Sequence, residues 1–248
     1  MNSTVKTMPD GLSTSELEAV AQGNRLALAK ALTSVDKHHA AIPSPAKRPP
    51  CFGITGAPGV GKSTLINAII TVLRARDLNV GALLVDPTHP VTGGALLGDR
   101  IRMNEHNQDS HVFVRSLGSR GGTGGVSSDL ESALNLMAHF PFDILLVETV
   151  GVGQLDIGIA SFVDKVLVVS PPGSGDDIQA MKASNLDIAD GVIINKADMP
   201  DEQVRRHENT LMMRAQLDPR VAEIPVFKTI ALTGEGVDEL VEKFMLQT

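Results

Sequence analysis

Short apolar runs recur along most of the chain, and segments expected to be helical lie between them. The runs are dominated by Val, Ile and Leu and lack a polar face, which is typical of strands buried on both sides of a parallel sheet. We expect a strand that begins at Cys51 and runs into a glycine-rich loop, and further strands at residues 79–86, 111–116, 142–148, 165–170, 191–195 and 225–230. Helices are expected to open at Lys62 and to lie at residues 128–139, 176–187, 201–217 and 235–246. This alternation predicts an α/β fold, a mostly parallel sheet with helices on both faces.

The first fifty residues have a different character. Ser13 to Glu16 supply a helix start, and apolar residues from Leu17 to Leu32 follow at roughly helical spacing. Four prolines within residues 41–50 then forbid a helix. We therefore divide the chain into an N-terminal helical arm with a proline-rich linker, residues 1–50, and a main domain, residues 51–248.

A glycine-rich loop follows the first predicted strand of the main domain and fits the P-loop pattern. Its glycines let backbone N–H groups turn toward a polyphosphate, and the helix that opens at Lys62 adds its positive dipole end. Lys62 is expected to reach the β- and γ-phosphates, and the Ser63 hydroxyl to ligate Mg²⁺. The expected phosphate-binding residues are Gly56, Ala57, Pro58, Gly59, Val60, Gly61, Lys62, Ser63 and Thr64. We expect this main domain to be a P-loop NTPase.

A second motif, Asn195-Lys196-Ala197-Asp198, stands at the end of a later strand. Guanine presents two N–H donors that one carboxylate accepts together, so Asp198 is expected to select guanine over adenine. Lys196 is expected to pack over the ring and Asn195 to tie the loops together. Ile230, Ala231 and Leu232 close the predicted site, and the Ala231 N–H is a candidate donor to the guanine carbonyl. These residues predict a GTP/GDP site.

Three carboxylates are candidates to serve the magnesium of such a nucleotide. Asp86 and Glu148 end predicted strands, and Asp99 lies in the long segment between them. Nucleotide-bound Mg²⁺ takes one or two protein oxygens besides phosphates and water, so some of the three are expected to hold metal-bound waters. Gly151, just after Glu148, could approach the γ-phosphate and rearrange when it leaves.

Composition excludes several function classes. The formal charge of −7 and the pI near 5.5 argue against a nucleic-acid surface, and the absence of Trp and Tyr argues against base-stacking platforms. The single cysteine, Cys51, fits a reducing compartment. No apolar run approaches the length of a membrane span or a signal-peptide core. We expect a cytoplasmic protein that binds neither nucleic acid nor membrane.

Taken together, these motifs resemble the MeaB/ArgK group of GTPases, called MMAA in animals, which belong to the SIMIBI class. The Glu-Thr-Val-Gly-Val-Gly-Gln and Pro-Val-Thr-Gly-Gly segments are far more specific than the P-loop. The matching segments are residues 54–64, 85–87, 90–94, 98–103, 121–125, 147–154, 175–182, 195–198 and 231–236.

The resemblance implies a G-protein chaperone whose GTP binding and hydrolysis gate the loading of adenosylcobalamin into a cobalamin-dependent acyl-CoA mutase and help to protect that mutase. It implies that residues 175–182 form a third switch and that Lys182 contributes to stimulated hydrolysis. Lys182 and Gln154 are the candidates for promoting attack by water, and which matters more is left open. Turnover is expected to be slow without the partner.

The chain departs from the family pattern in two places. Asp177 and Ile178 stand where the family usually has Glu and Leu, which bears on the partner contacts of the third switch. The sequence ends at Thr248, whereas family members continue into a helical arm that serves dimerisation. We therefore expect either a homodimer formed by other means, such as the N-terminal arm, or a monomer.

Two rival functions stay open at this point. A metallochaperone GTPase shares the fold class and the guanine motif, but it needs soft or imidazole ligand clusters, and one cysteine with seven scattered histidines offers no convincing set. The second rival is a nucleotide-regulated binding module with negligible turnover, or a P-loop kinase. Asp198 weakens the kinase interpretation, and stimulation of hydrolysis by a partner would exclude a silent binder.

Overall fold

A computed structural model of the chain describes residues 12–38, 40–86, 106, 108–118, 128–149, 158–172 and 186–247. Its centre is a seven-stranded sheet in the order β3-β2-β4-β1-β5-β6-β7, in which all neighbouring strands are parallel. The strands are β1 (Cys51–Thr55), β2 (Val80–Asp86), β3 (Val112–Gly118), β4 (Ile144–Thr149), β5 (Lys165–Ser170), β6 (Gly191–Asn195) and β7 (Val226–Thr229). The predicted α/β fold is confirmed.

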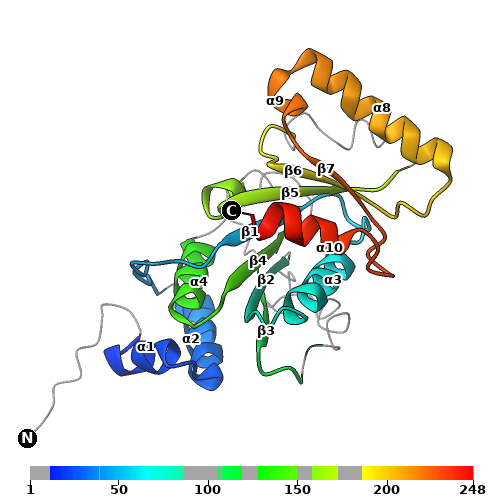
Figure 1. Cartoon of the computed structure of the whole chain (residues 1–248). Coiled ribbons are helices and arrows are strands. Elements are labelled where there is room, and N and C mark those ends of the chain that lie inside the picture. Colours follow the sequence, from blue (N-terminus) through cyan, green and yellow to red (C-terminus); the bar gives the residue numbers. More distant parts are fainter. Residues whose placement is uncertain are drawn as a thin grey trace, which may run out of the picture.

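Helices cover both faces of the sheet (Figure 1). One face packs against α3 (Lys62–Arg74), α10 (Val237–Leu240) and the π-helical turn η3 (Val241–Met245), and the other against α4 (Ser128–His139) and the short η2 (Ile159–Ser161). Side chains alternate between the faces along each strand. In β4, Leu145 and Val147 therefore join the α4 side, whereas Ile144 and Leu146 join the α3 side.

The predicted N-terminal arm consists of two helices, α1 (Thr14–Ala21) and α2 (Arg25–His38). At the start of α1, the Ser13 hydroxyl accepts a hydrogen bond from the Glu16 N–H while the Glu16 carboxylate accepts one from the Ser13 N–H, a capping box. Val20, Leu28 and Leu32 are fully buried in the same apolar cluster as α4. The arm thus adds a layer outside α4 to the core of the main domain.

Two further helices cover the end of the sheet that β6 and β7 form. Helix α8 (Asp201–Leu217) and the short α9 (Pro219–Ala222) lie beside β6 and β7, with Val192, Ile194 and Leu211 in a small apolar cluster (Figure 1). His207 of α8 is buried and its Nε2 lies 2.7 Å from the Ser170 hydroxyl at the end of β5. The bounds of α8 match the predicted helix, whereas most of the helix expected at residues 176–187 lies outside the described residues.

Cys51 is fully buried in β1, and this burial raises the pKa of its thiol to about 12. A thiol with such a pKa stays protonated at neutral pH, which agrees with a structural role. Among the described residues, no helix combines the length and the apolarity that crossing a bilayer requires.

Candidate nucleotide-binding site

The glycine-rich loop joins the end of β1 to the start of α3, at the carboxyl edge of the sheet. Gly56 and Gly61 have φ values of 143° and 97°, a region that L side chains rarely adopt. A Cβ atom on Gly56 would lie 2.1 Å from the carbonyl oxygen of Val169, and one on Gly61 would lie 2.5 Å from Nδ2 of Asn195. Neighbouring strands therefore require glycine at both positions, which fixes the path of the loop.

Lys62, the first residue of α3, folds back into this loop. Its Nζ donates hydrogen bonds to the carbonyl oxygens of Gly56, at 2.8 Å, and Ala57, at 3.1 Å. Only 6% of Lys62 is exposed, so the ammonium group is held inside the turn that would surround a polyphosphate. A cation placed there, next to a helix N-terminus, suits the binding of phosphate oxygens.

Ser63 and Glu148 meet beneath the loop. The Ser63 hydroxyl donates to Oε1 of Glu148 at 3.0 Å, and both residues are buried. Glu148 continues the alternation of β4 onto the α3 face, which explains why residues 85 positions apart are in contact. A hydroxyl and a carboxylate are hard oxygen donors of the kind that Mg²⁺ prefers, so this pair fits a nucleotide-bound magnesium ion.

Other predicted metal and catalytic residues are less fully described. Asp86 is the last residue of β2, where its neighbour Val85 pairs with Thr149 of β4, so its backbone lies at the same edge of the sheet as Glu148. The side chain of Asp86 lies outside the described part of the structure, and so do Asp99, Gln154 and Lys182.

A cavity of about 350 Å³ opens beside the loop, at the ends of β6 and β7. A volume of this size falls in the lower range of small-molecule sites. Eight of the residues that line it are among those predicted from the sequence: Gly61, Thr64, Asn195, Lys196, Asp198, Ile230, Ala231 and Leu232. The ninth, Met199, was not predicted. The structure thus brings the P-loop, the Asn-Lys-Ala-Asp turn and the segment after β7 together around one space.

Asn195 connects the three parts of this site. Its Nδ2 donates to the carbonyl oxygen of Val60 at 2.9 Å, while its Oδ1 accepts from the Thr229 hydroxyl at 3.1 Å and from the Ala231 N–H at 3.0 Å. The side chain is buried. The Ala231 N–H, which the sequence suggests as a donor to guanine, is thus engaged by Asn195, because the side-chain oxygen lies within hydrogen-bond distance of it.

Lys196 and Asp198 are placed at the mouth of the cavity. Lys196 has a positive φ of 60°. Its Nζ donates to the carbonyl oxygen of Gly59 at 2.9 Å, so the side chain reaches from the Asn-Lys-Ala-Asp turn to the P-loop. Asp198 is exposed, and within the described residues its carboxylate has no hydrogen-bond partner. That carboxylate is therefore available to accept hydrogen bonds from a ligand in the cavity.

Removing the Asn195 side chain is expected to weaken both the fold and nucleotide binding. Asn195→Ala leaves the Val60 carbonyl, the Thr229 hydroxyl and the Ala231 N–H without this partner, at about 1–3 kcal/mol for each buried group that stays unpaired. We expect the melting temperature to fall by about 5–10 °C and affinity for GDP to fall about tenfold. Differential scanning fluorimetry with and without GDP measures both, and Asn209→Ala on the exposed side of α8 is the matched control.

An Asn195→Ala variant with the wild-type melting temperature and GDP affinity would show that the three hydrogen bonds contribute little.

A parallel sheet whose first strand runs through a glycine-rich loop into a helix, with an Asn-Lys-Ala-Asp turn facing that loop, defines a P-loop GTPase. The chain belongs to the MeaB family: the family model described as methylmalonyl-CoA mutase-associated GTPase MeaB matches residues 28–247. As a member of this family of GTPases it binds guanine nucleotides and hydrolyses GTP.

Two relatives agree with this assignment, and a solved structure agrees with the fold. The chain is 40% identical over 237 residues to a putative GTPase of Pyrococcus horikoshii, covering 92% of this chain and 75% of the relative. It is 36% identical over 239 residues to the GTPase ArgK of Escherichia coli, covering 88% and 71%. A crystal structure titled LAO/AO transport system kinase superposes with a TM-score of 0.74 at 24% identity, covering 93% of this chain and 73% of that one, which supports the fold alone.

Proposed function

We propose that this GTPase is a chaperone of a cobalamin-dependent acyl-CoA mutase of the methylmalonyl-CoA mutase type. In this proposal its GTP cycle gates the loading of adenosylcobalamin into the mutase and protects the loaded enzyme. The observation that carries the proposal is the match to the mutase-associated family over residues 28–247, together with a nucleotide cavity bounded by the residues that a GTPase needs.

The contacts of the site suggest how a change at the γ-phosphate could reach another protein. The hydrogen bond between Ser63 and Glu148 joins the first turn of α3 to the end of β4, directly before residues 150–154, which include Gly151, the glycine that could approach the γ-phosphate. Ser63 would hold Mg²⁺, with Glu148, Asp86 and Asp99 as further candidates; the ion would offset negative charge on the phosphates. Loss of the γ-phosphate would then change the contacts that hold residues 150–154 in place.

Lys62 and the P-loop amides are proposed to bind the phosphates, and Asp198 to accept two hydrogen bonds from guanine. For hydrolysis, we propose that Gln154 and Lys182 act on the attacking water and on the charge that develops in the transition state. A lysine near the γ-phosphate would lower the barrier electrostatically, as other cationic groups do in phosphoryl transfer.

A turnover assay with candidate mutases tests the proposal. We expect slow GTP hydrolysis by the isolated protein and acceleration by about tenfold or more when the cognate mutase is added, because a partner that completes the site lowers the barrier. Transfer of adenosylcobalamin to the apo-mutase should differ between GDP and a non-hydrolysable GTP analogue. An acyl-CoA enzyme without a cobalamin site is the control.

If no candidate mutase changed turnover, and if cofactor transfer were independent of the nucleotide, the chaperone proposal would be wrong while the assignment as a GTPase would stand. Within the described residues, no group of three or more His, Cys, Asp and Glu side chains could hold a metal ion.

A further inference from the structure

One polar contact lies inside the interface between α8 and the sheet. Nε2 of His207 on α8 lies 2.7 Å from the hydroxyl oxygen of Ser170, the last residue of β5, and each of the two residues is only 5% exposed. Between an imidazole and a hydroxyl, either group can donate the hydrogen bond. Because bulk water does not reach this contact, solvent cannot readily replace one group if it is removed. The contact therefore ties α8 to the end of β5.

The end of β5 forms one wall of the P-loop. β5 pairs with β1 as far as Thr55, the residue directly before the loop. One position before Ser170, the carbonyl oxygen of Val169 comes so close to Gly56 that a Cβ atom on this glycine would lie 2.1 Å from it. The carbonyl oxygen of Gly56 in turn accepts a hydrogen bond from Nζ of Lys62. The position of the end of β5 therefore bears directly on the loop that would surround the phosphates.

Helix α8 is also connected to the other half of the nucleotide site. It begins at Asp201, three residues after Asp198 of the Asn-Lys-Ala-Asp turn. The strand before that turn, β6, pairs with β5, and its Ile194 lies opposite Ser170. His207 thus joins the helix that follows the Asn-Lys-Ala-Asp turn to the strand that contacts the P-loop.

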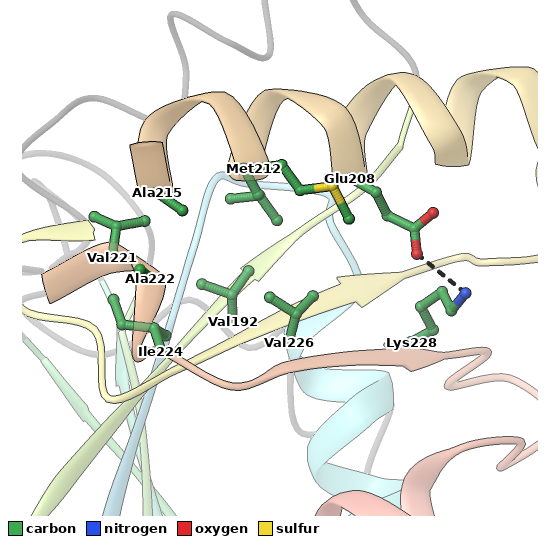
Figure 2. A pocket seen from close by; sticks show the side chains of 10 residues that line it. Val192, Glu208, Met212, Ala215, Val221, Ala222, Ile224, Val226 and Lys228 are labelled. Atoms are coloured by element: carbon green, nitrogen blue, oxygen red, sulfur yellow. Dashed lines mark ion pairs between the residues drawn. The ribbon is translucent and has the colours of Figure 1, made fainter. Parts of the chain in front are cut away.

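The second half of α8 leaves a gap between itself and the strands. A pocket of about 240 Å³ lies there, and Figure 2 shows Val192 of β6 and Val226 of β7 pointing across it toward α8. At one end the Lys228 ammonium group lies 3.0 Å from Oε1 of Glu208 on α8, but both side chains are accessible to solvent, so this ion pair contributes little to stability. Because a cavity separates this half of α8 from the sheet, the buried contact of His207 carries more of the position of the helix than it would in a closely packed interface.

We propose that His207, which does not line the nucleotide cavity, is a positioning residue for GTP hydrolysis. Acting through Ser170, it keeps the end of β5 against Gly56, so that the P-loop holds the phosphates in the geometry that attack by water requires. A displacement of about 1 Å can slow a reaction about 100-fold, whereas hydrogen bonds to phosphate oxygens tolerate small shifts. The contact therefore matters more for the rate of hydrolysis than for GDP binding. This role concerns the chain alone and is independent of a mutase partner.

Single-turnover hydrolysis of GTP, measured beside the affinity for GDP, tests this role. We expect His207→Ala to lower the hydrolysis rate about tenfold, while the affinity for GDP changes by less than about threefold. His207→Gln should restore most of the rate, because a glutamine amide reaches about as far as Nε2 of histidine and can also donate or accept a hydrogen bond. Thr210→Ala, which removes a hydrogen bond within α8 instead, is the matched control and should hydrolyse GTP like wild type.

Ser170→Ala removes the other partner of the hydrogen bond. If the two groups act through this one contact, Ser170→Ala should slow hydrolysis about as much as His207→Ala does, and the double variant should be no slower than either single variant. Thermal unfolding of each variant without nucleotide shows whether its fold is retained.

An unchanged hydrolysis rate in a folded His207→Ala protein would overturn the proposal, and so would losses of rate that multiply in the double variant. A hydrolysis rate and a GDP affinity that fall by the same factor would show that the contact only maintains the fold, which equally overturns the positioning role. Should His207→Ala not fold, the same criteria apply to Ser170→Ala, which removes a single oxygen atom.

Discussion

Lys62→Ala is expected to lower the affinity for GTP and GDP by about 100-fold or more. In the structure the Lys62 ammonium group is buried in the P-loop and donates to the carbonyl oxygens of Gly56 and Ala57, so it occupies the place where phosphate charge would arrive. A charge-assisted hydrogen bond is worth about 1.5–3 kcal/mol, and each 1.4 kcal/mol changes a dissociation constant about tenfold. GDP loses the contact to its β-phosphate, which accounts for this effect, and GTP loses the contact to the γ-phosphate as well.

The measurement is titration calorimetry with GDP, in the presence and absence of magnesium. Lys243→Ala is the matched control, because Lys243 is an exposed lysine paired with Glu239 on the surface. Thermal unfolding without ligand distinguishes loss of binding from loss of the fold, and we expect only a small shift of the melting temperature for Lys62→Ala. Unchanged GDP affinity in a folded Lys62→Ala protein would contradict the role of Lys62 in phosphate binding.

Much of the fold could be predicted because its central strands are buried on both faces. The central residues of β5 and β6, 166–169 and 192–194, are uniformly apolar, a pattern that indicates buried strands in segments of that length. The bounds of α8 were also predictable, since Pro200 precedes it and Asp218-Pro219 follows it. Local signals of this kind do not depend on the rest of the molecule.

Other features depend on contacts between distant residues, which local patterns do not report. The sequence suggests that the Ala231 N–H faces guanine, but the structure directs it to Asn195, 36 positions earlier. The burial of Leu28 and Leu32 against α4 likewise follows from how the arm folds back onto the domain. Met199 lines the nucleotide cavity only because the turn after Asn195 places it there.

The pocket between α8 and β7 could not be predicted for a related reason. Apart from Glu208 and Lys228, its lining residues are apolar positions of α8, β6, β7 and the segment between α8 and β7, and in sequence they look like core residues. The guanine preference, by contrast, rests on the Asn-Lys-Ala-Asp motif together with the cavity.

Asp198→Asn is expected to change the base preference from guanine to xanthine. The Asp198 carboxylate at the mouth of the cavity can accept hydrogen bonds from both N–H groups of guanine, whereas an asparagine amide presents one acceptor and one donor. The amide would oppose the guanine amino group but match the carbonyl that xanthine carries at that position. We expect affinity for GDP to fall about 100-fold, and xanthosine diphosphate to become the better ligand, because two charge-assisted hydrogen bonds are lost or reversed.

Competition between a fluorescent GDP analogue and unlabelled GDP, xanthosine diphosphate or ADP measures this preference. Asp201→Asn, the same substitution three positions later in the first turn of α8, is the matched control and should leave the preference for guanine unchanged. The wild-type chain should bind ADP far more weakly than GDP, because adenine has no pair of N–H donors at this edge and would leave the Asp198 carboxylate without partners. Equal affinities of the wild-type chain for ADP and GDP, or a guanine preference that survives Asp198→Asn, would show that another residue reads the base.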